Sequence, residues 1–201
     1  MSVIAVIACL DTKYHETVFV HQKIKEFGCK TLLIDISTGV NPPIVELIPD
    51  ISRNEIIIDA GSSWDEFCQL EKGVAIQIMA SYASLMVQEL YKKGKIDGII
   101  GMGGLQNTVI CSAAFRVLPI GFPKVICSTI ACGARTFDTV VGDKDIAVLP
   151  SIVDFAGINP ISEVILTNAV AAVVGMVKYG LHKIDTHGRQ LIGTTLMGIT
   201  N

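Results

Sequence analysis

A glycine-rich segment at positions 101–108 is the part of the sequence best suited to hold a phosphate group. Glycines let a backbone approach a phosphate closely, and a helix that begins beside them offers free N–H groups and the positive end of its dipole. The candidate contacts are Gly101, Gly103, Gly104, Asn107 and Thr108. A tight strand-to-helix turn that binds nothing would have the same composition, so the glycines alone leave both interpretations open.

Two standard nucleotide-binding motifs are absent from this segment. A Walker A loop needs Gly-Lys followed by Ser or Thr, and the sequence lacks it. The dinucleotide fingerprint needs a third small residue where Gln106 stands, and it should follow the first strand. Any phosphate site here must therefore be of another kind.

Three further segments carry polar side chains of the types that contact nucleotides. The candidates are Asp11, Thr12 and Lys13 in the first; Ser128, Thr129 and Gly133 in the second; and Asp154 and Asn159 in the third. A lysine and hydroxyls beside helix starts suit phosphate or sugar, and Asp154 could ligate magnesium through water or contact a ribose. Helix capping, turn capping and an acid that satisfies loop N–H groups are the structural alternatives.

Alternating apolar segments predict the elements that must position these residues. Continuous apolar runs indicate buried strands at 3–8, 31–36, 97–100, 124–128 and 146–149, with a possible short strand at 55–58. Helical patterns lie between them; one is capped by Asp11 or Thr12, one begins near positions 107–108, and one runs from Asn159 to about Tyr179. The fold class is α/β, with a doubly wound, mainly parallel, Rossmann-like sheet and helices on both faces.

In such a sheet ligands bind beyond the carboxyl ends of the strands, where all four segments fall. Asp35, at the end of the second strand, also suggests a ribose contact, but the glycine segment belongs to another part of the sheet. We expect residues 1–188 to form this lobe. The strand-like run at 191–200 predicts that residues 189–201 begin a truncated second lobe.

Composition excludes several classes of protein. Half of the 201 residues are hydrophobic, 17% are charged and the formal net charge is −3, so the basic surface typical of nucleic-acid binding is absent. The apolar runs are too short or too interrupted to predict a signal peptide or membrane span, and we expect a cytoplasmic protein. The six cysteines form no CxxC pair, which favours buried thiols, and the four histidines form no metal set.

The polar segments also resemble the motifs of a known family, both in their residues and in their order along the chain. The motifs are Asp11-Thr12-Lys13 with Glu16, the stretch 101–133, and the segments 141–145, 151–154, 157–159 and 168–169. They are similar to the ATP-binding domain family named for the tomato mosaic virus resistance protein, whose bacterial and fungal members are uncharacterised. The resemblance implies ATP, magnesium, a dimer and a second lobe of similar size.

One segment departs from that family. Its usual glycine loop is Gly-Gly-Ser-Gly-Gly-Thr, whereas Leu105, Gln106 and Asn107 follow Gly104 here. We expect the Gln106 and Asn107 side chains to obstruct a phosphate, and Leu105, unlike serine, to donate no hydrogen bond, so that binding is weakened. The leading hypothesis is an ATP-binding lobe. The alternatives are an ATP-using hydrolase or ligase that needs the missing lobe, and a degenerate lobe kept for oligomerisation or partner binding.

Overall fold

The computed structural model describes residues 1–39, 47–131, 138–181, 188 and 190. A five-stranded, all-parallel sheet forms its centre, with the strand order β2-β1-β3-β4-β5. The strands are β1 (Val3–Ala8), β2 (Lys30–Asp35), β3 (Gly98–Gly103), β4 (Lys124–Ser128) and β5 (Ala147–Pro150). This confirms the doubly wound α/β fold expected from the sequence.

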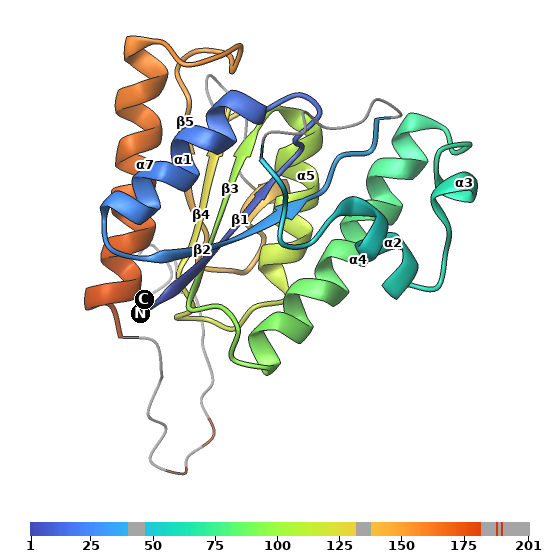
Figure 1. Cartoon of the computed structure of the whole chain (residues 1–201). Helices are drawn as coiled ribbons and strands as arrows, with labels where there is room; N and C mark the ends of the chain where they lie inside the picture. The colour runs from blue at the N-terminus through green and yellow to red at the C-terminus, as the bar shows by residue number, and fades with distance from the viewer. Residues whose placement is uncertain (40–46, 132–137, 182–187, 189, 191–201) are drawn as a thin grey trace, which may run out of the picture.

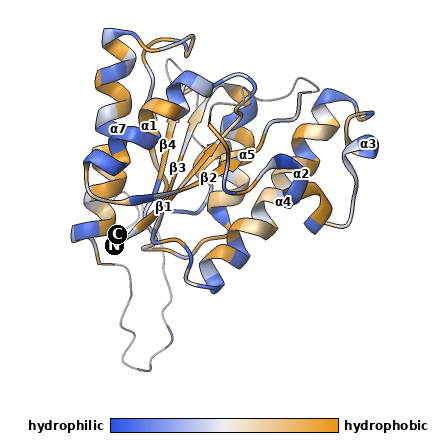
Figure 2. Cartoon of the chain, viewed as in Figure 1, coloured by the Kyte–Doolittle hydropathy of each residue, from blue (hydrophilic) through white to orange (hydrophobic). Residues whose placement is uncertain are grey.

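Helices cover both faces of the sheet (Figure 1). One face carries α1 (Tyr14–Glu26) and α7 (Pro160–Tyr179). The other carries α2 (Arg53–Asp59), α3 (Trp64–Phe67), α4 (Lys72–Lys92), α5 (Leu105–Arg116) and α6 (Asp138–Val141). The strands are almost uniformly apolar and the helices turn their apolar sides toward them (Figure 2), because a parallel sheet is buried on both faces.

The expected strand at 55–58 is wrong, because this segment lies within helix α2. Its run of Ile56, Ile57 and Ile58 has high strand propensity, but a capping box precedes it. Ser52 accepts from the backbone of Glu55, and Glu55 accepts from the backbone of Ser52. These two hydrogen bonds satisfy N–H groups at the helix start, and the helix buries Ile56 and Ile57 in the core.

Two helix starts also differ from expectation. Helix α1 begins at Tyr14 with no side-chain cap, so Asp11 and Thr12 do not cap it. Helix α5 begins at Leu105, two residues before the expected start, with Gly104 at the N-cap position. The N-terminal turn of α5 therefore follows β3 directly.

Helix α7 is, among the described helices, the one long and apolar enough to cross a membrane. It packs along β3, β4 and α1, and its buried residues belong to the core of that face. Its composition is thus that of a helix covering a buried sheet.

The described cysteines are free thiols, as expected. Four are buried and Cys68 is half-buried, whereas Cys132 lies outside the described residues. Burial raises the pKa of both Cys111 and Cys127 to about 12, so neither is a ready nucleophile.

Candidate functional site

The sheet has its switch point between β1 and β3. From β1 the chain crosses to β2 on one side, and it later returns to β3 on the other side. Helix α1 follows β1 on one face, while α5 follows β3 on the opposite face (Figure 1). In doubly wound proteins the ligand-binding crevice lies at the carboxyl edge of such a switch point, and we refer to this edge as the crevice.

Helix α5 points its N-terminus at this edge without a side-chain cap. Gly104 occupies the N-cap position, and no side chain there bonds to the helix backbone. A Cβ at Gly104 would meet Thr129 Oγ1 at 3.6 Å, an ordinary contact. The backbone N–H groups of the first turn thus have no side-chain cap, as in anion sites at helix N-termini.

The other two glycines of this segment are required by the fold. Gly103 has φ 142°, and a Cβ there would collide with the Asn107 side chain. A Cβ at Gly101 would collide with Cys111. Packing therefore explains both, and among the three glycines only Gly104 would accept a Cβ without a collision.

Asn107 does not obstruct the helix N-terminus, contrary to expectation. Its side chain is buried and its Nδ2 donates to the carbonyl oxygen of Met102 at 2.8 Å. Gln106 also turns away, toward β1 and β2, and its Nε2 donates to Thr38 Oγ1 at 2.8 Å. Leu105, the first residue of α5, is 61% exposed. The sequence could not reveal these directions because they depend on where α5 begins.

The structure brings Thr108 and Ser128 together. Their hydroxyl oxygens are 2.7 Å apart, and Thr108 Oγ1 also donates to the Gly104 carbonyl at 2.8 Å. The neighbouring Thr129 N–H donates to the Gly103 carbonyl at 3.0 Å. The buried hydroxyls of Thr108 and Ser128 therefore stabilise the turn between β3 and α5. The Thr129 hydrogen bond connects this turn to the end of β4.

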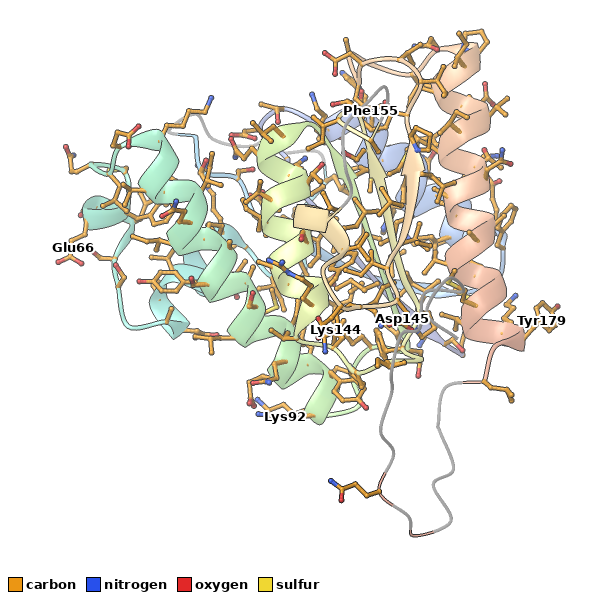
Figure 3. The ribbon with its side chains drawn as sticks, turned by 180° about the vertical axis from the view of Figure 1, so that it is seen from behind. Glu66, Lys92, Lys144, Asp145, Phe155 and Tyr179 are labelled. Atoms are coloured by element: carbon orange, nitrogen blue, oxygen red, sulfur yellow. The ribbon has the colours of Figure 1, made fainter. Side chains whose placement is uncertain are left out.

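The loop after β5 is fastened to the start of α1. The amino group of Lys13 donates to the Phe155 carbonyl at 2.9 Å, and the Gly157 N–H donates to Glu16 Oε1 at 2.8 Å. Figure 3 shows Phe155 at the end of the molecule where this loop lies. Lys13 thus positions one wall of the crevice. The sequence pointed to Glu16 only through the family motif. In the structure it is 1% exposed, and a buried acid of this kind needs a specific partner, here the Gly157 N–H.

Asp154 and Asn159 lie in or beside the same loop but have local partners. Asp154 is exposed, and its Oδ1 accepts from the Phe155 N–H at 2.8 Å. Asn159 caps α7 by accepting from the N–H groups of Ile161 and Ser162, both at 3.0 Å. Two residues before Asp154, Ile152 has φ 66°, a costly conformation for a β-branched residue and of a kind that concentrates at functional sites.

Two acids at the other side of the crevice each have one oxygen that no described residue hydrogen-bonds. Asp35 is buried and its Oδ1 accepts from the N–H groups of Leu10, at 3.2 Å, and Ser37, at 2.9 Å. Burial raises the pKa of Asp35 despite these bonds and the charge of Arg53. Asp35 Oδ2 and Asp11 Oδ1 are buried and have no hydrogen bond with the described residues. Asp35 therefore stabilises the loops after β1 and β2 through its hydrogen bonds, and it is too buried to contact a ribose.

The described residues contain no group of three or more His, Cys, Asp or Glu side chains that could hold a magnesium ion. Exposed Asp154 could supply one ligand, whereas the unbonded oxygen of Asp11 is buried. This fits a magnesium ion that is bound mainly through phosphates and water. Gly133, the remaining candidate, lies outside the described residues.

The sequence did not indicate Lys124 as important, yet it is fully buried and charged. Its Nζ lies 2.7 Å from Asp145 Oδ1 and donates to the carbonyls of Pro119 and Phe122, both at 2.8 Å. In Figure 3 Asp145 lies at the opposite end of the molecule from Phe155. This pair therefore belongs to the amino edge of the sheet and stabilises the fold away from the crevice.

Fold and crevice together place the protein among the doubly wound, Rossmann-like α/β domains. Residues 2–182 match the N-terminal domain of the uncharacterised protein family UPF0261, and the chain belongs to this family. The family is the one suggested by the sequence motifs, because its members include the tomato protein described next.

Two curated relatives extend well beyond this chain. A UPF0261 protein of Clostridium tetani is 38% identical over 98% of this chain and 48% of its own length. The ToMV resistance protein Tm-1(GCR237) of Solanum lycopersicum is 32% identical over 96% of this chain and 28% of its own length. Among solved structures, MurG of Acinetobacter baumannii aligns over 79% of this chain and 44% of its own, with a TM-score of 0.43 and 15% identity. The chain thus spans about half of the first relative.

Proposed function

We propose that this domain is the nucleotide-binding lobe of a two-lobe protein and that it holds the phosphates of ATP at the N-terminus of α5. The observation that carries the proposal is the uncapped N-terminus of α5 beside the β1/β3 switch point. A phosphate there would accept from N–H groups that have no intrahelical partner and would meet the positive end of the helix dipole.

The surroundings favour a nucleotide over a bare anion. The loops after β1, β3, β4 and β5 all reach this edge, and two of them are tied together by Lys13 and Phe155. They offer Thr12, Thr129 and Asp154 for sugar, base or magnesium. Any reaction catalysed on ATP would need residues from the further length of chain that the relatives possess.

The substitution Gly104→Asp tests the site without endangering the fold. Gly104 has φ −82° and ψ −159°, which suits an aspartate N-cap, and a Cβ meets no clash. The carboxylate would occupy the N–H groups and repel phosphate. We expect ATP affinity, measured by calorimetry with magnesium, to fall at least about tenfold, or roughly 1.4 kcal/mol, while thermal stability is kept or raised.

Ser63→Asp is the matched control. Ser63 caps α3 by accepting from the Glu66 N–H at 3.3 Å, so the change adds the same charge to another N-cap. Its ATP affinity should equal that of the wild type. The proposal fails if Gly104→Asp folds and binds ATP as tightly as Ser63→Asp does.

A further inference from the structure

The side chain of Gln106 connects α5 to the loop after β2. Its Nε2 lies 2.8 Å from Thr38 Oγ1 and 3.4 Å from Cys9 Sγ, and Cys9 directly follows β1. The Gln106 side chain therefore extends from the first turn of α5, past the end of β1, to the loop after β2. We call this pair the Gln106–Thr38 latch.

The loop after β2 is also fixed by the elements on either side of it. The Asp11 N–H donates to Ser37 Oγ at 3.2 Å, and Arg53 Nη1 donates to the Gly39 carbonyl at 2.7 Å. A Cβ on Gly39 would lie 2.6 Å from Asp11 Oδ2, so not even a methyl group fits between the two loops. The β2 side of the crevice is closed by these contacts together.

The β4 side of the crevice has the opposite character. Among the described residues, a Cβ at Gly104 would meet Thr129 Oγ1 at 3.6 Å, an ordinary contact, so a small atom is tolerated beside the α5 N-terminus. Beyond β4, the loop after β5 presents the exposed side chains of Ile152 and Asp154. Polar groups accessible to a ligand therefore lie toward β4 and β5.

We infer that a ligand whose phosphates are held at α5 extends over the ends of β4 and β5, and that the Gln106–Thr38 latch excludes it from the β2 side. This inference rests on the proposed function, and it assigns the direction of the nucleoside along the sheet. Gln106 acts as a specificity-determining residue, because it closes the path from the α5 N-terminus to the end of β2.

Hydrogen exchange of backbone amides, followed by mass spectrometry on the full chain with and without Mg-ATP, tests the direction. We expect ATP to slow exchange in peptides covering 103–108, 128–131 and 151–158, and to leave 36–39 unchanged. Without ATP, Gln106→Ala should speed exchange at 36–39 several-fold, because the latch no longer holds that loop. Thr38→Val, which removes the acceptor, should act in the same way.

Val109→Ala, a truncation on the exposed side of the next turn of α5, is the control and should not change exchange at 36–39. Protection of 36–39 by ATP in the wild type would overturn the inference while leaving the proposed function intact. Exchange at 36–39 that is equal in Gln106→Ala and wild type would also overturn it. If neither Mg-ATP nor Mg-tripolyphosphate changes exchange or releases heat, the proposed function fails, and the inference fails with it.

Discussion

Single buried charges show how strongly the fold depends on partners that are distant in sequence. Lys124 is 0% exposed at its side chain, and its ammonium group is satisfied by two carbonyls and Asp145. Burial alone would raise the pKa of Asp145. The hydrogen bonds from Lys124 and from the Gly121 N–H, with the Lys124 charge, outweigh burial and lower it.

The pair predicts a pH-dependent effect of Asp145→Asn. At neutral pH the variant leaves the buried ammonium without a countercharge, and we expect a loss of about 1–3 kcal/mol in the free energy of unfolding. A lowered folded-state pKa means that the stabilisation is complete above the ordinary value of 3.8 and is lost as pH falls through the folded value.

Urea denaturation of both proteins from pH 7 to pH 3 would measure this effect. The difference between them should be constant down to about pH 4 and narrow below it. Asp143→Asn is the control, because Asp143 is exposed and forms no hydrogen bond or ion pair with the described residues. A difference that widens on acidification would contradict the assigned direction.

At the scale of elements, helix starts decide which candidate residues face a ligand. Asn159 accepts from two N–H groups of α7 and, with Ser162, forms a capping box. Its oxygen is therefore already used by the helix. The residue contributes to the site by fixing where α7 begins and where the preceding loop ends.

Asn159→Ala should cost about 1 kcal/mol, because the first turn of α7 loses its cap. Asn159→Asp keeps an acceptor and adds a charge that the helix dipole favours, so its stability should match the wild type. Thermal denaturation compares the three proteins. Equal stability of the alanine and wild-type proteins would show that the capping bonds contribute nothing measurable.

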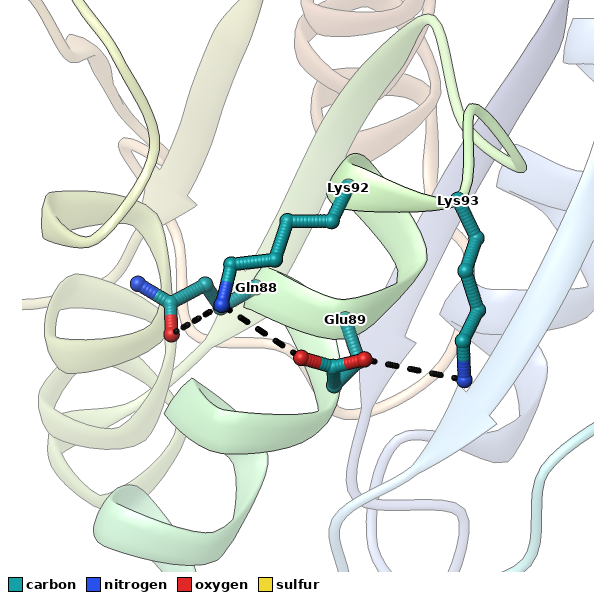
Figure 4. Close-up of polar contacts among 4 residues, drawn as sticks. All are labelled: Gln88, Glu89, Lys92 and Lys93. Carbon is teal, nitrogen blue, oxygen red and sulfur yellow. Dashed lines mark hydrogen bonds and ion pairs between the residues drawn. The ribbon is translucent and has the colours of Figure 1, made fainter.

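At the scale of the whole molecule, a groove of about 330 Å³ lies between α2 and α4. Apolar Ile56, Tyr82 and Leu85 line it, and Leu85 is 59% exposed. At its rim Glu89 pairs with Lys93 at 3.6 Å and with Lys92 at 3.4 Å (Figure 4). These ion pairs are exposed and add little stability, so the apolar floor dominates this surface.

An apolar groove of this kind leads us to expect self-association of the chain. Leu85→Lys would place a charge on the groove and should shift sedimentation toward the monomer. Val164→Lys alters an apolar residue of similar exposure on α7 and should not. A wild-type chain that sediments as a monomer at high concentration would contradict the prediction.

The sequence by itself predicted the parallel sheet, its five described strands and the edge at which the polar loops meet. Continuous apolar runs such as Val3–Ala8 predict buried strands because both faces of a parallel sheet are covered. Its glycines also marked the junction of β3 and α5, and its proline marked the start of α7, since these residues have local conformational preferences.

Only the tertiary structure decided the direction of each side chain and the start of each helix. Ile56, Ile57 and Ile58 favour a strand locally, but the Ser52–Glu55 capping box and burial against the core make this segment helical. Gln106 and Asn107 appeared to obstruct a phosphate, but α5 begins at Leu105 and turns both toward partners at Thr38 and Met102. A buried polar side chain is stable only where it finds a hydrogen-bond partner, and that partner is supplied by the fold. Local propensity therefore does not predict its direction.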